Sequence, residues 1–462
     1  MLASDRRNFL FGSGAAALLA GAPPAFAQSG PGPRLPESLE RELAAELEAA
    51  QIVGAAITVV QAGEVRAFMP FGRASVPFDR PVTPSTLFHT GSVGKHVTAL
   101  AILQLVEAGQ LSLDAPIGGV VPGLADWIAA IPIRHLLGHT SGVPEYTTDT
   151  FEWDRPMSRQ SILAALERPD FAPGETWSYS NTAYVLLGYA IEAVSGVGYA
   201  DYVNQRLFQV AGLPRARADT AGDAIVERAE PYDVVDGRVR HAVRMEDGVS
   251  SAPDGGLLMS GQDWAPWERA IGGGRLVGPA MRQAIFTHGT LNDGVASGYG
   301  LGWFIDEVRG RPVHYHSGGV PGFITLARYH PAEQLMAVAT FNSPPQRPVR
   351  NLLERAIETV VPGVTTIGLT AQSQSEARDT RLRAFLAGGT DEDLVLPSLL
   401  LGERVSGREP ARRLSGPLES AEFLESHAVT GGQLARYRLT VGGVPLLRQI
   451  GWTPDDRIFL FR

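Results

Sequence analysis

Residues 91–108 read GSVGKHVTALAILQLVEA, and this pattern predicts a helix that is apolar on nearly every side. Helices without a polar face lie in the middle of large domains, because each of their sides needs an apolar neighbour. Gly109 follows, as is typical of a helix end. Ser92 and Lys95 stand at the start with i, i+3 spacing, which places both side chains on one face, one turn apart. The stretch therefore predicts a buried central helix with a serine and a lysine at its N-terminus.

Lys95 is the only lysine among the 40 Lys and Arg residues of the 462-residue chain. Arginine keeps its proton in proteins, whereas a buried lysine can become neutral and take part in proton transfer. A serine at a helix N-terminus also lies where unpaired backbone N–H groups and the helix dipole favour a developing oxyanion. The pair therefore predicts a nucleophilic serine, Ser92, beside an amine that helps to remove its proton.

Two further segments carry groups that are suited to the same chemistry. The first is Tyr179-Ser180-Asn181, whose phenol can pass protons when neighbouring positive charge lowers its pKa. The second is His316-Ser317-Gly318-Gly319, at the end of a predicted strand. Glycines beside a strand edge allow a substrate backbone to approach closely and to form hydrogen bonds with the strand. We expect both segments to belong to the same site as Ser92.

At these three places the chain resembles the penicillin-recognising serine hydrolases. This family includes class C β-lactamases, D-Ala-D-Ala carboxypeptidases, D-aminopeptidases and β-lactamase-like esterases. The resemblance runs from about residue 40 to residue 360. It also includes three shorter segments: LLGHTSG at 136–142, DGGL at 254–257 and YGLGW at 299–303.

The family pattern implies a role for each matching residue. Ser92 would be the acylated nucleophile, and Lys95 the amine that helps to activate it. Tyr179 would be the general base that then protonates the leaving group. Asn181 would form hydrogen bonds with the substrate amide and with Lys95. The backbone N–H groups of Ser92 and Gly319 would form the oxyanion hole.

The same pattern makes His316, Ser317, Gly318 and Gly319 substrate-binding residues and implies no metal or organic cofactor. His316 stands where β-lactamases carry the lysine of a Lys-Thr-Gly motif, and a mostly neutral imidazole binds a carboxylate less well than an ammonium does. The resemblance therefore implies hydrolysis of a small amide, D-amino peptide or ester through an acyl-enzyme. Two alternatives stay open: a carboxylesterase of this family, and a non-catalytic penicillin-binding or scaffold protein of the same fold.

The predicted elements indicate an α/β fold. They are helices at 36–51, 92–108, 349–360 and 379–386, short helices within 120–270, and strands at 55–60, 65–68, 312–316, 323–329, 334–341, 437–441, 445–452 and 457–461. Strands at both ends of the large domain, with a helical middle third, predict one α/β domain whose sheet is closed by its own termini. The family resemblance implies that this is a β-lactamase-like antiparallel sheet flanked by helices, with an all-helical subdomain, in a hydrolase domain at 28–362. A linker at 363–378 and a small α+β domain at 379–462 would follow. The latter loosely resembles nuclear-transport-factor-like domains.

Composition and the N-terminal segment limit partners and location. The net charge of −9 disfavours nucleic-acid binding, and the lack of cysteine excludes disulfides and thiolate metal sites. Paired arginines, a short apolar stretch and an Ala-Phe-Ala site within residues 1–27 predict a twin-arginine signal peptide, cleaved after Ala27. We therefore expect a periplasmic or secreted protein, without a transmembrane segment after cleavage. The sequence leaves its oligomeric state open.

Overall fold

The computed structural model describes residues 34–147, 151–155, 158–220, 222–246, 253–347, 349, 351–406 and 417–462. The predicted signal peptide at residues 1–27 lies outside these described residues.

The described helices and strands follow the chain in a fixed order. The helices are α1 (Glu37–Ala49), η1 (Gly91–Gly94), α2 (Lys95–Glu107), η2 (Ile117–Gly119), α3 (Asp126–Ala129), α4 (Ile133–Leu137), α5 (Arg159–Ala164), α6 (Asn181–Ser195), α7 (Tyr199–Tyr202), η3 (Val203–Phe208), α8 (Gln209–Ala211), α9 (Trp264–Gly272), α10 (Pro279–Ile285), η4 (Pro331–Glu333), α11 (Leu352–Val360), α12 (Glu376–Leu386) and α13 (Pro397–Val405). The strands are β1 (Gly54–Gln61), β2 (Glu64–Ser75), β3 (Arg80–Pro81), β4 (Leu87–His89), β5 (Arg217–Ala218), β6 (Tyr232–Val235), β7 (Arg238–His241), β8 (Leu257–Ser260), β9 (Phe304–Val308), β10 (Arg311–Val320), β11 (Phe323–His330), β12 (Leu335–Phe341), β13 (Leu418–Val429), β14 (Gly432–Val441), β15 (Val444–Trp452) and β16 (Ile458–Phe461).

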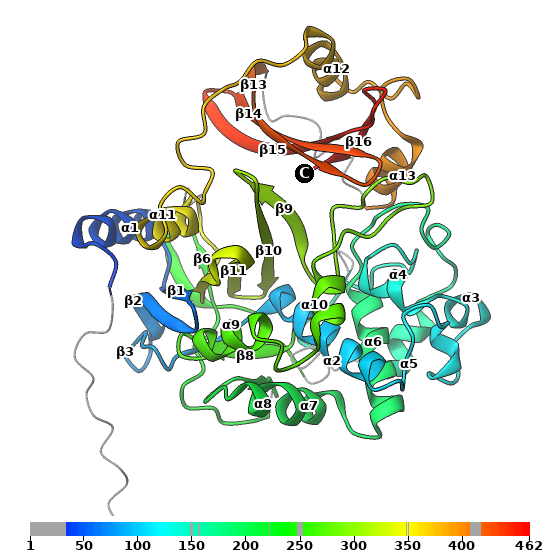
Figure 1. Ribbon diagram of the computed structural model, residues 1–462. Helices are drawn as coiled ribbons and strands as arrows, with labels where there is room; N and C mark the ends of the chain where they lie inside the picture. The colour runs from blue at the N-terminus through cyan, green and yellow to red at the C-terminus, as the bar shows by residue number, and fades with distance from the viewer. Residues whose placement is uncertain are drawn as a thin grey trace, which may run out of the picture. The chain divides into compact units, whose positions relative to one another are not determined.

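A seven-stranded antiparallel sheet forms the centre of the large domain, in the order β3-β2-β1-β12-β11-β10-β9. Its N-terminal strand β1 pairs with β12, from Ala55 opposite Phe341 to Gln61 opposite Leu335. Figure 1 shows β9, β10 and β11 side by side at the other end of this sheet. Strands from the beginning and the end of the large domain therefore close one sheet, as the sequence predicts.

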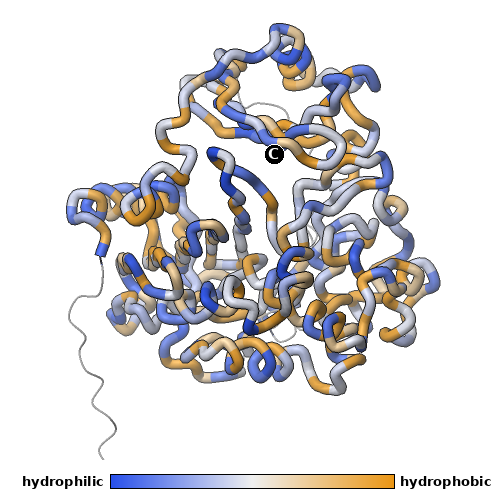
Figure 2. The backbone as a smooth tube through the Cα atoms, in the orientation of Figure 1, coloured by the Kyte–Doolittle hydropathy of each residue, from blue (hydrophilic) through white to orange (hydrophobic). Residues whose placement is uncertain are grey.

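Helices cover both faces of the central sheet. On one face, α1 and α11 pack through Leu43, Leu47 and Ile357 against β1 and β12, and Figure 1 shows these two helices side by side. In Figure 2, α1 carries both hydrophilic and hydrophobic segments, as expected for a helix with one buried side. On the other face, α2, α6 and α9 form the largest apolar cluster. The sheet is therefore buried on both sides.

The all-helical subdomain follows η1, and its central helix is α2. Every residue of α2 from Lys95 to Leu103 is buried, because α6, α9 and α10 surround it. The predicted helix at 92–108 is confirmed, except that its first turn is the 3-10 turn η1. Gly91 adopts a φ of +51°, which glycine tolerates without strain and which turns the chain sharply from β4 into the helix. The predicted fold class is confirmed.

The C-terminal part contains a second antiparallel sheet, in the order β13-β14-β15-β16, with α12 packed on its core. The predicted strands overlap β14, β15 and β16, but β13 and α13 were not expected from the sequence. β13 lies at the sheet edge and carries Glu419, Glu422 and Glu425, so it lacks the apolar alternation of a half-buried strand. Residues 361–375, all of which the structure describes, form no helix or strand. The exact domain boundaries stay a prediction.

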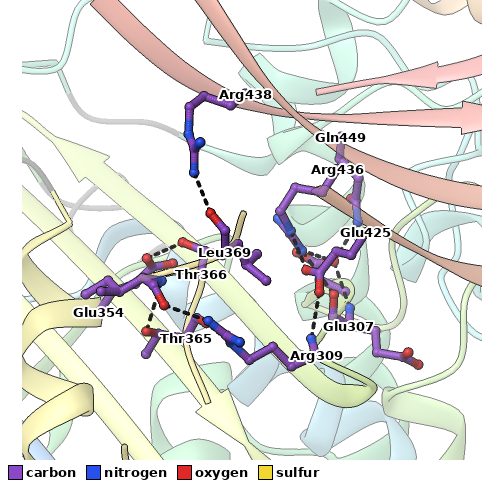
Figure 3. Close-up of polar contacts among 12 residues, drawn as sticks. Glu307, Arg309, Glu354, Thr365, Thr366, Leu369, Glu425, Arg436, Arg438 and Gln449 are labelled. Atoms are coloured by element: carbon purple, nitrogen blue, oxygen red, sulfur yellow. Dashed lines mark hydrogen bonds and ion pairs between the residues drawn. The ribbon is translucent and has the colours of Figure 1, made fainter. Parts of the chain in front are cut away.

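A buried ion pair joins β14 of this sheet to β9 of the large domain. The Arg436 guanidinium donates to both carboxylate oxygens of Asp306 at 2.9 Å and to Glu425 at 2.9 Å. Gln449 also donates to Asp306. Figure 3 shows the side chains of Arg436, Glu425 and Gln449 gathered at this contact. The ion pair thus connects the C-terminal sheet to β9, the strand that pairs with β10.

Candidate active site

Ser92 and Lys95 lie together where η1 passes into α2. The Lys95 ammonium is fully buried, and its Nζ lies 3.2 Å from Ser92 Oγ. Burial lowers the pKa of Lys95 to about 8, while the nearby Asp254 and Glu145 carboxylates act in the opposite direction. A measurable fraction of this amine is therefore neutral near pH 7, as a proton acceptor needs to be.

The other two contacts of Lys95 orient its lone pair. Nζ donates to Asn181 Oδ1 at 2.6 Å and to the Asp254 carbonyl at 2.7 Å. Both of these oxygens can only accept, whereas the Ser92 hydroxyl can also donate. When the amine loses its proton, its two remaining N–H groups stay on the two acceptors. The lone pair then faces Ser92 Oγ.

Asn181 is held in place by the start of α6. Ser180 caps this helix by accepting a hydrogen bond from the Ala183 N–H at 3.1 Å. The Asn181 backbone N–H donates to Glu145 Oε2 at 2.6 Å, and its side-chain Nδ2 donates to Thr147 Oγ1 at 3.2 Å. These contacts leave the Asn181 amide oxygen directed at Lys95.

Tyr179 lies on the other side of the lysine. Lys95 Nζ is 4.8 Å from the centre of the Tyr179 ring, and the His139 ring packs on that ring at 4.2 Å. His139 in turn accepts a hydrogen bond from the Ser180 N–H at 3.1 Å through Nδ1. Burial raises the pKa of Tyr179 well above its usual value, and the smaller opposing effect comes from the Ser92 hydroxyl. At neutral pH the side chain is therefore a phenol, which can give a proton before it can take one.

Strand β10 brings the third predicted segment to the nucleophile. A side chain at Gly318 would approach the Thr90 carbonyl to 2.1 Å and the Ser92 nitrogen to 2.8 Å, so only glycine allows this contact. β10 pairs with β9 only as far as Tyr315, and beyond that point Ser317 and Gly319 are exposed. The free edge of β10 next to Ser92 is a place where an extended substrate could pair.

The His316 side chain is directed inward. Its Nε2 lies 3.0 Å from the Tyr299 hydroxyl, and its Nδ1 lies 2.6 Å from the Ser317 carbonyl. Burial, and to a smaller extent the charge of Lys95, lowers the pKa of His316 to about 3. The ring is therefore neutral, and both of its nitrogens already have partners. The exposed backbone of Ser317 and Gly319 faces the site instead.

Several residues around Lys95 were not predicted as site residues. Asp254 and Tyr299 lie within the segments that carry the family resemblance, and the sequence indicated no role for them. The Tyr146 hydroxyl donates to Asp254 Oδ2 at 3.0 Å. Glu145 Oε1 accepts from both the backbone and the hydroxyl of Thr147. For Glu145 to Thr147, the only sequence signal was their position just after the 136–142 segment.

Within the described part of the chain, no group of three or more His, Asp or Glu side chains is arranged to hold a metal ion. The same residues include no single helix that is both long and apolar enough to cross a membrane. Two helical segments joined by a bend, Asn181–Ser195 and Tyr199–Ala211, reach that length and hydropathy only when they are taken together.

Known proteins share this sequence and fold. The family model described as Beta-lactamase matches residues 39–360. Penicillin-binding protein 4* of Bacillus subtilis is 31% identical over 58% of this chain and 64% of its own length. The D-aminopeptidase of Brucella anthropi is 29% identical over 63% of this chain and 56% of its own. These matches span less than two thirds of either relative. The solved D-stereospecific amidohydrolase from a Streptomyces species aligns with a TM-score of 0.60 at 25% identity, over 71% of this chain and 99% of that chain.

Proposed function

Because the chain belongs to the Beta-lactamase family, we propose that it is a serine hydrolase that forms an acyl-enzyme on Ser92. We further propose that it cleaves an amide bond of a small D-amino acid or D-amino peptide derivative. The observation that carries the proposal is the set of contacts of Lys95 Nζ. It donates hydrogen bonds to two oxygens that can only accept, so that the lone pair of the neutral amine is directed at Ser92 Oγ. A serine so placed is ready to lose its proton as it attacks.

In the acylation step, Ser92 Oγ bonds to the substrate carbonyl carbon and its proton passes to neutral Lys95. The carbonyl oxygen takes up negative charge beside the backbone N–H groups of Ser92 and Gly319, at the positive end of α2. When the tetrahedral intermediate collapses, the carbon–nitrogen bond breaks and the leaving nitrogen takes a proton. The resting phenol of Tyr179 can supply that proton, and the protonated Lys95 can then restore it. This order gives the base role first to Lys95 and keeps the acid role for Tyr179.

In the deacylation step, a water molecule attacks the ester carbonyl of the acyl-enzyme. Its proton passes to the Lys95–Tyr179 pair, the ester bond to Ser92 Oγ breaks, and the serine regains a proton. Since the same oxyanion site serves both steps, no additional group is needed to complete the cycle.

The side chains around β10 support a substrate whose leaving group carries no carboxylate. His316 is neutral with both nitrogens engaged, so it presents no cation to a substrate carboxylate. A β-lactamase or a carboxypeptidase substrate carries such a carboxylate, whereas an amino acid amide or an ester does not. Two of the similar proteins, a D-aminopeptidase and a D-stereospecific amidohydrolase, point toward the amide of a D-amino acid.

The test is hydrolysis of D-phenylalanine amide, with L-phenylalanine amide and p-nitrophenyl acetate as comparison substrates and Ser92→Ala as the control. We expect the D-amide to be hydrolysed with a kcat/KM at least tenfold above that of its enantiomer, and the Ser92→Ala protein to be inactive. Turnover of the acetate ester without turnover of either amide would instead support a carboxylesterase. Equal activity of the Ser92→Ala protein would overturn the acyl-enzyme mechanism itself.

A second measurement detects the acyl-enzyme without assuming the substrate. In time-resolved intact mass with benzylpenicillin we expect an adduct that depends on Ser92 to form slowly, because neutral His316 presents no cation to the carboxylate of the drug. A persistent adduct supports a slowly deacylating amidase or peptidase, and conversion of the drug to its hydrolysed form supports a β-lactamase. The absence of an adduct and of hydrolysis would argue against penicillin recognition.

A further inference from the structure

A cavity of about 370 Å³ lies between the large domain and the C-terminal sheet. Trp177 and Phe304 line it from the large domain, and Leu399, Arg448 and Phe461 from the C-terminal part. Its volume is within the range of sites that bind small molecules, and most of its lining is apolar with a few polar groups. None of the predicted catalytic residues lines it, so it is separate from the site at Ser92.

One wall of this cavity is shared with the candidate active site. The Trp177 ring lies 6.4 Å from the ring of Tyr179, and the Phe304 ring lies 5.3 Å from that of His316. Trp177 and Phe304 contact each other at 5.9 Å. A ligand in the cavity would therefore lie one layer of aromatic side chains away from the proton-transfer residues.

Arg448 is one of the two arginines that line this cavity, together with Arg462. It is half-buried, and among the described residues its hydrogen bond goes to the Leu447 carbonyl, with no carboxylate within ion-pair distance. Burial lowers the pKa of Arg448, with no carboxylate acting against it. By contrast, the neighbouring Arg462 donates to Gln449 and to the carbonyls of Gly298 and Ile305. A guanidinium without an acid partner, at the edge of an apolar cavity, is suited to pair with an incoming carboxylate.

We propose that this cavity binds a small monocarboxylic acid with an aromatic or branched apolar body. The carboxylate pairs with Arg448, and the apolar body lies against Trp177 and Phe304. The buried Glu403 side chain also lines the cavity. This inference does not depend on the chemistry proposed at Ser92.

The test is calorimetric titration of the full chain with 3-phenylpropanoate, compared with the neutral 3-phenylpropan-1-ol. We expect saturable one-to-one binding of the acid and at least tenfold weaker binding of the alcohol. Arg448→Gln should lose at least tenfold in affinity, whereas Arg457→Gln, which removes an arginine beside the same sheet but outside the cavity, should bind as the wild type does.

Binding is read out without reference to hydrolysis, so its outcome is separable from that of the proposed function. The comparison of acid with alcohol uses the wild-type protein, so it holds even where a variant does not fold. No saturable binding of 3-phenylpropanoate, equal binding of the alcohol, or unchanged affinity in a folded Arg448→Gln protein would each overturn the proposal.

Discussion

Replacing Lys95 with arginine keeps a positive charge at the start of α2 but removes a base. In the wild-type protein the buried Nζ is held by Ser92, Asn181 and the Asp254 carbonyl, and its pKa is about 8. A guanidinium cannot lose its proton in a protein and has no lone pair to face Ser92 Oγ. We therefore expect Lys95→Arg to lose nearly as much activity as Ser92→Ala.

The magnitude follows from the fraction of neutral base. With a pKa of about 8, roughly a tenth of the Lys95 amine is neutral at pH 7, whereas for a guanidinium the neutral fraction is only roughly a few in a million. General base catalysis by a positioned side chain contributes about 10²–10⁴-fold to a rate, and this sets the upper limit of the loss. Lys95→Arg should therefore slow acylation of Ser92 by about 10²–10⁴-fold, which corresponds to about 3–5.5 kcal/mol in the activation free energy.

The assay is the second-order rate constant for modification of Ser92 by a fluorophosphonate, followed by intact mass. This reagent reports the reactivity of the serine itself and does not require the natural substrate. Lys95→Met is the matched control, because it has similar length and lacks both the charge and the base. Circular dichroism of each variant establishes that it is folded before its rate is compared.

We expect both variants to be slow and the pH dependence near pH 8 to disappear in each. A folded Lys95→Arg protein that retains more than about a tenth of the wild-type rate, a change below ~1.4 kcal/mol in the barrier, would refute the role given to Lys95 as the proton acceptor.

Three other perturbations test the surroundings of the site. The wild-type kcat/KM should rise with pH through about 8 as Lys95 becomes neutral, and Asp254→Asn should move this limb about one pH unit lower, because the carboxylate raises the pKa of the lysine; an unmoved pH profile would contradict this. His314 is buried and its folded pKa is about 3, so the unfolded chain binds a proton between about pH 6.5 and 3 that the folded chain does not. The stabilisation from this difference is complete above about pH 6.5, and below that pH it falls by on the order of 1 kcal/mol per pH unit. In urea unfolding from pH 7 to pH 5, the free energy of unfolding should therefore decline less steeply in His314→Leu than in the wild type. Arg436→Met leaves the buried Asp306 carboxylate without its ion pair and should cost about 3–5 kcal/mol in denaturant unfolding, and a loss below about 1 kcal/mol would show that the contact is not stabilising.

The elements of the large domain could be predicted because their signals are local. The apolar stretch that forms α2 needs no information beyond its own residues, and the β-branched strands β1 and β12 read the same way. The edge strand β13 could not be found, since its glutamates lie on a surface whose burial depends on the rest of the sheet. Strand β10 also extends beyond its prediction, because Gly318 and Gly319 carry no strand signal and are held there by pairing with β11.

The candidate site was predicted in its centre and missed in its surroundings. Ser92 and Lys95 were found from their spacing, and Tyr179 and Asn181 from the family pattern. Asp254 contributes a backbone carbonyl, and such an acceptor has no side-chain signature that a sequence can display. The inward turn of His316 toward Tyr299 was likewise invisible, since a ring orientation is a property of packing.

The sequence by itself determined which groups can react and where the buried helix begins, because i, i+3 spacing and apolar periodicity act over a few residues. Only the tertiary structure decided which way the Lys95 lone pair faces. That direction is set by Asn181 and Asp254, which lie 86 and 159 residues away along the chain and meet the lysine only when α6 and the segment before β8 pack around α2. The same holds for the cavity beside Arg448, since its two walls come from parts of the chain that no local pattern connects.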